Sequence, residues 1–324
     1  MELIRGIHNI KPRHRGCVLT IGNFDGVHQG HHAVLARLQE KAAQLGLPAC
    51  VMLFEPQPLE LFAGADAPAR LSRWREKYEA LKGMQIDRML CVRFTHRFAE
   101  QAASSFIEQL LVEKLGVHYL VVGDDFRFGK GREGDFHLLE AAGHRFGFEV
   151  ISTQSFQVER QRVSSTLVRE ALKAGRMAEV ELMLGRPYAI SGRVAHGDKL
   201  GRTIGFPTAN LALKRQVIPV GGVFAVEVLC SGKTFPGVAN VGVRPTLSGT
   251  QARLEVHLFD FSGDLYGQQV KVLLRHKLRE EQKFASFTAL KEQIERDALA
   301  ARAWFGLPPF NLPSTLLEKK GTQD

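Results

Sequence analysis

Two histidines, His28 and His31, stand three apart where an apolar run gives way to a helical pattern, in GNFDGVHQGHHAV (residues 22–34). A helix N-terminus carries unpaired N–H groups and a partial positive charge, so it attracts phosphate. Imidazoles placed there can donate hydrogen bonds to a phosphoryl group as it gains negative charge in a transition state. Three glycines of the segment would let the backbone approach the phosphates closely: Gly22, Gly26 and Gly30. The segment therefore favours phosphoryl-type transfer by positioning and charge stabilisation, without a protein nucleophile.

Two other interpretations of the histidine pair stay open at this point. A zinc site needs three or four ligands, and no cysteine or carboxylate stands at a telling spacing from the pair. The pair could also be purely structural, as part of a helix start.

A second anion-binding candidate is the serine-rich turn VSSTLVR (residues 163–169). Ser164, Ser165 and Thr166 precede a helical pattern, so they predict a helix cap, and a helix start with free hydroxyls also binds anions. Arg169 follows one turn later and keeps its charge, which suits a clamp on a departing pyrophosphate. Taken alone, such a stretch is more often a cap followed by an exposed arginine.

The segment GKGREG (residues 129–134) matches G-x-G-x-x-G and raises the alternative of a dinucleotide-binding dehydrogenase. That fingerprint should follow its strand directly, whereas DDFRF separates it from the apolar run that ends in VVG. The spacing therefore disfavours a dehydrogenase.

In the second half of the chain, a glycine-rich basic loop precedes the segment PTAN (residues 207–210). The loop is not a Walker A motif, because the G-K-[ST] ending is missing, and a flexible turn is the alternative. Thr208 and Asn210 offer a hydroxyl and an amide oxygen two residues apart. Hard oxygen ligands of this kind suit Mg²⁺.

The run LEVHLFDF (residues 254–261) alternates between apolar and polar residues. In a strand this puts Leu254 and Val256 on one face and Glu255 and His257 on the other. A carboxylate off the core face is usually only solvated, so alternation alone gives Glu255 no role.

The elements that must position these residues in the first half alternate between buried strands and helices. Unalternated apolar runs, typical of strands buried on both faces, cover residues 17–21, 49–54, 88–92, 119–122 and 148–152. Helical patterns separate the runs; in the first, Val34, Leu38 and Leu45 are expected on one face, with Gly46 as the stop. The pattern predicts a doubly wound parallel α/β domain over residues 1–185.

The pattern changes after Arg186-Pro187-Tyr188. Period-two alternation and Gly/Pro/Ser turns predict strands of an antiparallel barrel or sandwich, at residues 223–229, 253–261 and 269–277. One long amphipathic helix, roughly residues 285–306, should pack against it. We therefore expect a second domain over 186–310 and a disordered tail over 311–324.

Composition agrees with two domains of a soluble globular protein, at 324 residues with 44% hydrophobic side chains. The net charge of +9 favours anionic partners, but the basic residues are spread out and form no stripe interleaved with aromatic residues. Nucleic-acid binding therefore ranks second. We expect a cytoplasmic protein without a membrane partner, because no apolar run is long enough to cross a bilayer and the N-terminus lacks the core of a secretion signal. The four cysteines show no paired spacing and are expected to pack in the core.

Taken in order, the motifs of the first half resemble those of one known family. Residues 24–31 (FDGVHQGH) resemble the HxGH signature of the nucleotidyltransferase superfamily, in the form it takes in bacterial bifunctional riboflavin kinase/FAD synthetases. Residues 54–58 (FEPQP) resemble that family's FxPxP segment, and residues 123–135 resemble its second flavin- and ATP-site loop. Residues 163–169 resemble its ISSTxxR motif, with Val163 in place of isoleucine.

The second half continues the resemblance. HGDKLGRTIGFPTAN (residues 196–210) is similar to the riboflavin kinase signature, and LEVHLFDF, LYG and REEQKF follow in the family's order. The resemblance spans residues 1 to about 310. It implies a Rossmann-like HxGH nucleotidyltransferase domain for FMN adenylylation and a barrel domain with riboflavin kinase activity.

The resemblance also implies site residues. For the adenylyltransferase it assigns His28, His31 and Arg169 to charge stabilisation and the following to the ATP site: Gly22, Phe24, Asp25, Gly26, His28, His31, Ser164, Ser165, Thr166 and Arg169. It places the following at flavin sites: Phe62, Asp125, Phe128 and Arg279. For the kinase it makes Glu255 the general base, Thr208 and Asn210 the metal ligands, and assigns to ATP Gly197, Lys199, Gly201, Arg202, Gly205, Pro207, Thr208 and Asn210. His32 and His257 receive no role.

The resulting hypothesis is an enzyme of flavin cofactor biosynthesis. It would use MgATP to convert riboflavin to FMN and a second ATP to convert FMN to FAD and pyrophosphate, with Mg²⁺ as the cofactor and small molecules as partners. The competing hypothesis is a non-catalytic basic protein that binds nucleotides or nucleic acid.

Overall fold

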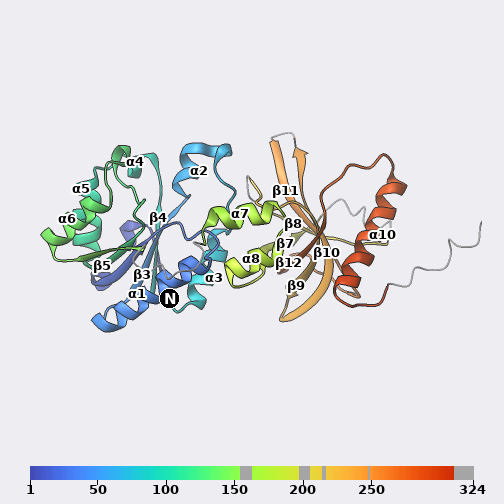
Figure 1. Cartoon of the computed structure of the whole chain (residues 1–324), viewed down its shortest axis with the longest axis horizontal. Helices are drawn as coiled ribbons and strands as arrows, with labels where there is room; N and C mark the ends of the chain where they lie inside the picture. The colour runs from blue at the N-terminus through green and yellow to red at the C-terminus, as the bar shows by residue number, and fades with distance from the viewer. Residues whose placement is uncertain (154–162, 197–204, 214–216, 247–248, 310–324) are drawn as a thin grey trace, which may run out of the picture. The chain divides into compact units, whose positions relative to one another are not determined.

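The structure, a computed structural model, describes residues 1–153, 163–196, 205–213, 217–246 and 249–309 (Figure 1). The chain forms two compact units. The first unit comprises Met1–Leu172, Val180–Arg186 and Gln216–Pro219; the second comprises Lys173–Glu179, Pro187–Arg215 and Val220–Asp324. The tail expected to be disordered, residues 311–324, lies outside the described residues.

The first unit is built on a six-stranded parallel sheet with the strand order β1-β4-β3-β2-β5-β6. The strands are β1 (Glu2–Arg5), β2 (Cys17–Ile21), β3 (Ala49–Glu55), β4 (Arg88–Arg93), β5 (Val117–Val122) and β6 (Glu149–Ser152). All five predicted strands are present, and the predicted α/β fold is confirmed. The sequence analysis missed β1, which has only four residues and a single buried one, Ile4, so it shows no apolar run.

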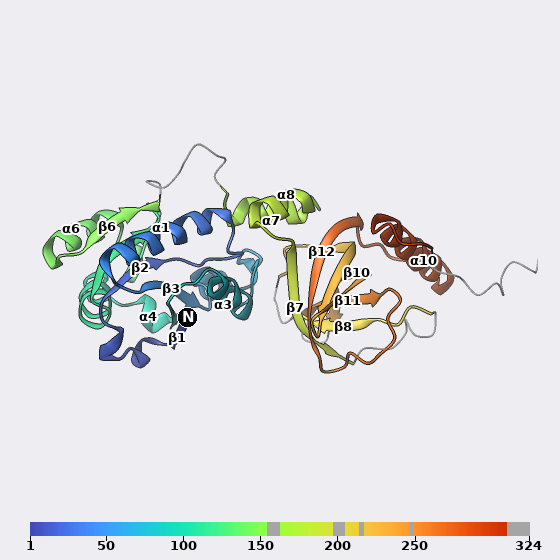
Figure 2. The same ribbon diagram turned by 90° about the horizontal axis from the view of Figure 1, so that it is seen from below.

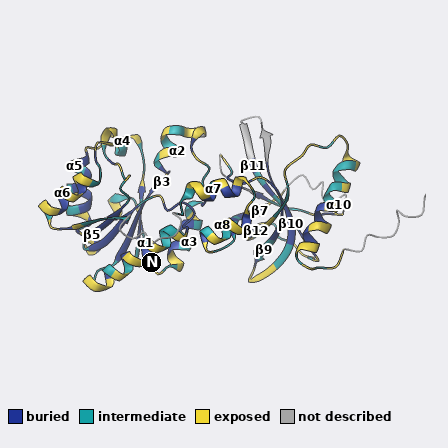
Figure 3. Cartoon of the chain, in the orientation of Figure 1, coloured by how far each residue is buried: buried dark blue, intermediate teal, exposed yellow. Residues whose placement is uncertain are grey.

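Helices cover both faces of this sheet. The helices that precede the strands of the second unit are α1 (Gln29–Leu45), α2 (Pro58–Ala63), α3 (Trp74–Gly83), α4 (His96–Ala99), α5 (Ala103–Ser105), the π-helix Phe106–Lys114, α6 (Phe136–Phe146), α7 (Ser165–Lys173) and α8 (Met177–Leu184). Short 3₁₀ turns lie at Ile7–Asn9, Pro12–His14, Gly64–Asp66 and Lys130–Arg132. One core cluster joins α1 and α3 to the sheet and a second joins α5, the π-helix and α6 to it, so alternate strand residues are buried on opposite faces. Figure 3 shows that the strands of this sheet are mostly buried.

The expected buried face of α1 needs a correction. Leu35, Leu38 and Ala42 are buried, whereas Leu45 is 44% exposed. At 100° per residue, Leu45 lies about 80° around the helix from Leu35. Gly46 ends the helix as predicted, in the left-handed conformation with φ 63°.

The second unit is a closed six-stranded barrel with the strand order β10-β11-β8-β7-β12-β9, paired antiparallel throughout. Its strands are β7 (Tyr188–Ala195), β8 (Ala209–Ala212), β9 (Gly222–Cys230), β10 (Lys233–Thr246), β11 (Gly249–Leu258) and β12 (Gln269–Arg279). The barrel alternative of the prediction is confirmed. The sequence analysis did not predict β7, β8 or β10; glycine interrupts β7, and proline and glycine interrupt β10.

The predicted C-terminal helix is α10 (Phe287–Trp304), capped by Ser286, whose Oγ accepts the Ala289 N–H. It lies against the outside of the barrel beside β10 (Figures 1 and 2). Ala298 and Ala301 pack there with outward-facing residues of the strands, among them Val223 and Val238. None of the helices in the described residues is long and apolar enough to cross a membrane.

Candidate active sites

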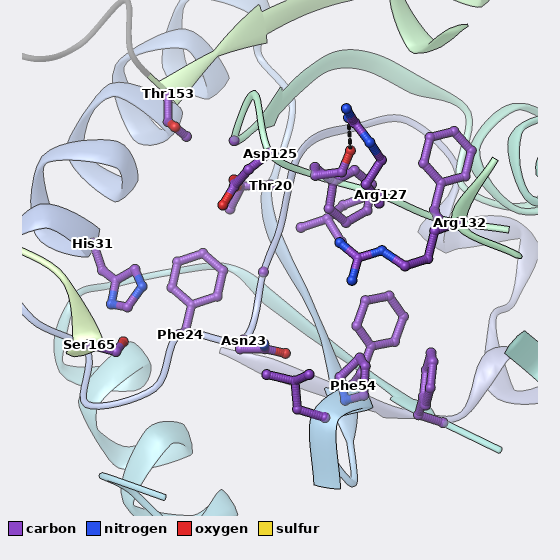
Figure 4. Close-up of a pocket in the computed structure, with 18 of the residues that line it drawn as sticks. Thr20, Asn23, Phe24, His31, Phe54, Asp125, Arg127, Arg132, Thr153 and Ser165 are labelled. Atoms are coloured by element: carbon purple, nitrogen blue, oxygen red, sulfur yellow. Dashed lines mark hydrogen bonds between the residues drawn. The ribbon is translucent and has the colours of Figure 1, made fainter. Parts of the chain in front are cut away.

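A cavity of the first unit has a volume of about 1110 Å³ and brings together motifs that are far apart in the sequence (Figure 4). Nine of the predicted residues line it: Gly22, Phe24, His28, His31, Phe62, Asp125, Phe128, Ser164 and Ser165. It opens beyond the carboxyl ends of β2, β3, β5 and β6, the usual place for ligands in a parallel α/β sheet.

The two histidines cap helix α1 reciprocally. His28 is the N-cap residue, and its Nδ1 accepts the His31 N–H at 3.4 Å, while His31 Nδ1 accepts the His28 N–H at 3.3 Å. The rings stack with their centroids 3.7 Å apart. Because each Nδ1 is an acceptor, the proton of each neutral ring must be on Nε2. The cap therefore makes each Nε2–H the hydrogen-bond donor.

Both histidines are neutral at neutral pH. Burial, together with the nearby charges of His32, Arg169 and Arg186, lowers the pKa of His28 to about 4, against the opposing effect of Asp25. Burial also holds the pKa of His31 well below its ordinary value. The neighbouring His32 is hydrogen-bonded to the same turn: its Nε2 lies 3.1 Å from the Val27 carbonyl oxygen.

Asp25 is 2% exposed and does not line the cavity. Its carboxylate accepts the backbone N–H groups of Leu71 and Ser72, each at 3.0 Å, and Arg169 Nη2 at 2.6 Å. Arg169 Nε donates to the Ala69 carbonyl oxygen at 2.6 Å. These bonds tie the HxGH turn to α7, and they leave Arg169 Nη1 without a hydrogen bond to the described part of the chain.

The start of α7 has the predicted cap. Ser164 Oγ accepts the Leu167 N–H at 3.3 Å, and Ser165 Oγ donates to the Asp25 carbonyl oxygen at 2.9 Å. Thr166 is exposed and does not line the cavity. The hydroxyl of Ser165 therefore links the serine-rich turn to the HxGH turn.

Glycine is required in the HxGH segment by the chain's own packing. A Cβ atom at position 30 would lie 2.9 Å from the Val163 carbonyl oxygen and 3.1 Å from the His28 ring. Gly26 has φ +85°, and a Cβ atom there would lie 2.9 Å from Leu71. Close approach of phosphate at these glycines stays a prediction.

The other part of the cavity is aromatic. Phe62 is 60% exposed and meets the Phe94 ring edge-on, with the ring centroids 6.0 Å apart. Phe128 is only 7% exposed and stacks on Phe126 with centroids 5.6 Å apart. Asp125 is exposed at the cavity wall. Phe62 thus presents more ring surface to a ligand than Phe128 does.

The sequence analysis missed several polar residues of the same wall: Thr20, Asn23, Arg127, Arg132 and Thr153 (Figure 4). Arg127 and Arg132 lie in the loop that was predicted to resemble the second flavin- and ATP-site loop. Their charge was the available signal, but nothing in the local pattern shows which way a loop side chain points.

In the second unit, the register of three strands aligns polar residues in one row. Glu255 on β11 pairs with Asn210 on β8 and with Asn240 on β10. Directly opposed residues face the same side of a sheet. Leu254 and Val256 are buried at 0% and 1% exposure, so the predicted alternation is confirmed and the row faces away from the barrel interior.

Asn240 was not predicted as a site residue. Its Nδ2 is 3.5 Å from Glu281 Oε1, and its buried Oδ1 has no hydrogen-bond partner in the parts of the chain that the structure describes. The row therefore combines amide and carboxylate oxygens, which fit a hard cation such as Mg²⁺.

His257, left without a role by the sequence, contacts the segment before the predicted metal ligands. Its Nδ1 donates to the Pro207 carbonyl oxygen at 2.9 Å, and its ring packs edge-on against Phe206. Burial lowers the pKa of His257. Gly205 has φ +86°, and the other predicted loop residues lie outside the described residues: Gly197, Lys199, Gly201 and Arg202.

Arg279, implied at a flavin site, is engaged in a structural ion pair. Its Nη2 and Nε donate to the Asp297 carboxylate at 2.6 to 3.0 Å, which joins β12 to α10. The guanidinium also lies 5.8 Å from the Phe284 ring centroid. A direct flavin contact stays a prediction.

No group of three or more His, Cys, Asp or Glu side chains within the described residues is placed to hold a metal ion. All four cysteines are free; Cys17, Cys50 and Cys230 are buried as predicted, and Cys91 is half-buried.

Known proteins resemble this chain over nearly its whole length. The family described as FAD synthetase matches residues 10–167, and the family described as riboflavin kinase matches residues 184–305. The bifunctional riboflavin kinase/FMN adenylyltransferase of Escherichia coli (strain K12) is 60% identical, covering 95% of this chain and 99% of the relative. That of Pseudomonas fluorescens is 53% identical, covering 94% and 97%.

A crystal structure titled as a macrolide-efflux protein from Streptococcus pneumoniae has the same fold, with a TM-score of 0.78, 30% identity, and coverage of 94% of this chain and 100% of that one. The relatives that share more than half of their residues with this chain carry both activities in their names. The chain belongs to the family of bifunctional riboflavin kinase/FMN adenylyltransferases.

Proposed function

We propose that the second unit transfers the γ-phosphoryl group of MgATP to riboflavin, giving FMN and ADP, and that the first unit joins FMN to the adenylyl group of a second ATP, giving FAD and pyrophosphate. The observation that carries the adenylylation site is the single cavity lined by the HxGH turn, the serine-rich turn and the aromatic loop residues. The competing hypothesis, a non-catalytic basic binding protein, is not supported, because both halves match enzyme families.

In adenylylation, an oxygen of the FMN phosphate attacks the α-phosphorus of ATP, and the bond to the pyrophosphate oxygen breaks. His28 and His31 would donate their Nε2–H groups to the phosphoryl oxygens as charge develops. Since both rings are neutral, they act as donors without transferring a proton. Ser164, Ser165 and Thr166 would hold phosphates, and Arg169 would stabilise the departing pyrophosphate through its remaining donors.

The aromatic part of the cavity would take the isoalloxazine ring. The exposed face of Phe62 offers a stacking surface, and Phe128 and Asp125 complete the wall. An aromatic surface next to two turns that could bind phosphate matches the two parts of FMN, its flat isoalloxazine ring and its phosphate.

In the kinase unit, Thr208 and Asn210 would hold Mg²⁺, which neutralises the charge of the ATP phosphates when it is bound. Glu255 would accept the proton of the ribityl hydroxyl while the hydroxyl oxygen attacks the γ-phosphorus and ADP leaves. Arg279 would contact the flavin, and its ion pair with Asp297 on α10 would fix its position. We propose the cytoplasm as the compartment and small molecules as the partners, with no nucleic acid or membrane.

The test is to incubate the full-length protein with riboflavin, ATP and Mg²⁺ and to separate the flavins. Both FMN and FAD should form. The double variant His28→Asn/His31→Gln keeps side chains that can cap a helix but removes both imidazoles. It should form FMN at the wild-type rate and lose FAD formation.

Stoichiometric zinc that is present in the wild type and lost in the double variant would contradict this role of the histidines. Absence of both flavin products from the wild type would contradict the proposed function.

A further inference from the structure

The backbone turn before α1 adopts a conformation that most residues avoid. Phe24, Gly26 and Val27 have φ values of 46°, 85° and 44°. Only glycine adopts this left-handed region freely, and a β-branched residue such as Val27 is an outlier there. Such a conformation persists only where the surrounding contacts over-determine it.

Arg186 supplies several of those contacts. It follows α8 and belongs to the first unit. Its Nη2 donates to the Gly26 carbonyl oxygen at 2.7 Å, and its Nη1 donates to the carbonyl oxygens of Val27 at 3.2 Å and Leu184 at 3.1 Å. The planar fork of a guanidinium suits this bridging of two successive carbonyls, which a lysine cannot reproduce.

Lys77 on α3 holds the same turn at another carbonyl. Its side chain is 0% exposed, and its Nζ donates to the Asn23 carbonyl oxygen at 2.8 Å. The carbonyl oxygens of Asn23, Gly26 and Val27 thus each accept a hydrogen bond from a cationic side chain.

The contact of Arg186 with Val27 reaches the histidines through one peptide unit. The Val27 carbonyl and the His28 N–H belong to the same peptide, which is planar. That N–H donates to His31 Nδ1 and so orients the His31 ring. Fixing the Val27 oxygen therefore fixes the direction of the bond that orients the ring.

We propose that Arg186 is a positioning residue for adenylyl transfer, because it holds the peptide between Val27 and His28 and thereby the orientation of the histidine pair. The inference rests on the function proposed for the cavity of the first unit. Arg186 falls inside the segment that matches the riboflavin kinase family, residues 184–305, yet its contacts serve the other activity.

The charge of Arg186 has a second measurable effect. It is one of the groups that lower the pKa of His28, after burial, His32 and Arg169, while Asp25 acts in the opposite direction. Removing the charge should therefore raise the pKa of His28.

The experiment compares Arg186→Gln and Arg186→Lys with wild type in the full-length protein, with Arg176→Gln as a matched control. Arg176 is half-exposed and bonded to Glu179. Arg186→Gln should lower the turnover of FAD formation from FMN about 10- to 100-fold, since small displacements of catalytic groups cost that much. Arg186→Lys should lower it less. Riboflavin phosphorylation should change less than about twofold in every variant.

A histidine NMR titration supplies a second readout. Loss of packing around His28 would also raise its pKa, because burial is the main cause of the low value, so the comparison with Arg186→Lys, which keeps the charge, isolates the effect of the charge. The pKa of His28 should rise above its wild-type value in Arg186→Gln and stay unchanged in Arg186→Lys and Arg176→Gln. If Arg186→Gln fails to fold and so loses both activities, the result for Arg186→Lys decides. A fall in FAD formation alone supports the inference. An equal fall in both activities, or no fall in either, overturns it.

A wild-type protein that forms FAD together with an Arg186→Gln variant that forms it at least half as fast would overturn the inference and leave the proposed function standing. A wild-type protein that forms no FAD would instead contradict the proposed function.

Discussion

At the scale of single residues, the hydrogen bonds made by one atom of a side chain decide what its other atoms can offer to a ligand. His28 and His31 use Nδ1 to cap α1, which leaves Nε2–H as the donor on each ring. In the second unit, Glu255 lies in a row between Asn210 and Asn240, and the resemblance to the family predicts that it is the general base.

Replacing Glu255 with glutamine tests that role. The variant keeps the size and the hydrogen bonding of the side chain but removes its basicity. Because an alcohol is a poor nucleophile at neutral pH, the turnover of riboflavin phosphorylation should fall about 10²- to 10⁴-fold. The Michaelis constant for riboflavin should change little, because the interaction is lost in the transition state.

FMN adenylylation by the same preparation is the control for Glu255→Gln and should be unaffected. A variant that keeps most of its kinase turnover would show that Glu255 only orients the substrate or faces solvent.

Stability should depend on pH through His28. Its pKa is about 4 in the folded protein against 6.5 for the free side chain, so between these values the unfolded chain binds a proton that the folded chain does not. The free energy of unfolding of the first unit should therefore be highest above pH 6.5 and fall, by up to about 3 kcal/mol, as the pH drops towards 4.

Urea unfolding curves at several pH values measure this effect. In a Trp304→Phe background, Trp74 is the only tryptophan left, and its fluorescence reports the first unit. The fall should be smaller in His28→Asn, with the remainder due to His31. If the free energy of unfolding depends equally on pH in the Trp304→Phe protein and in its His28→Asn variant, the low pKa of His28 is contradicted.

At the scale of elements, the proposed adenylylation site is formed where the start of α1 closely approaches the start of α7. Gly30 on α1 faces the Val163 carbonyl oxygen, two residues before α7 begins. The separation of these segments is set by the absence of a side chain at position 30.

Gly30→Ala should therefore impair adenylylation. Its methyl group would lie 2.9 Å from the Val163 oxygen and 3.1 Å from the His28 ring, so one of the two must move. Turnover of FAD formation should fall by about 10- to 100-fold. Steady-state assays of both activities measure the effect, and riboflavin phosphorylation should stay at the wild-type level.

Gly83→Ala is the matched control for Gly30→Ala, because it ends α3 and a Cβ atom there meets nothing within 4 Å. If Gly30→Ala forms FAD as fast as Gly83→Ala, the close approach of α1 and α7 is not needed for catalysis.

At the scale of the whole molecule, the chain passes between the two units more than once near Arg186, whereas the change of sequence pattern suggested a single boundary there. Arg186 belongs to the first unit, and Lys173–Glu179 belongs to the second. A Cβ atom at Gly175 would lie 2.4 Å from the Lys277 side chain, which shows how closely that segment packs on β12.

The two activities should nevertheless be separable. A fragment that starts at about residue 186 should phosphorylate riboflavin and form no FAD. A fragment that starts at Lys173 should do the same with a higher melting temperature, because it keeps the segment packed on β12. Flavin separation and thermal unfolding of both fragments measure this; a fragment that folds and binds riboflavin yet forms no FMN would show that the predicted domain bounds are wrong.

The amino-acid sequence by itself determined the features that depend on neighbours along the chain. The five apolar runs became parallel strands, the alternation in LEVHLFDF placed Leu254 inside and Glu255 outside, and Ser164 capped its helix. Each of these follows from a local period or a local hydrogen bond. The order of the motifs was enough to indicate the family.

Only the tertiary structure decided which distant residues meet. The Arg169–Asp25 ion pair, the bonds from Arg186 to the HxGH turn, and the row formed by Asn210, Glu255 and Asn240 each join segments more than ten residues apart. The choice of a closed barrel over a sandwich belongs to the same class. Strand register and helix packing set these contacts, because long-range hydrogen bonds leave no periodic trace in the sequence.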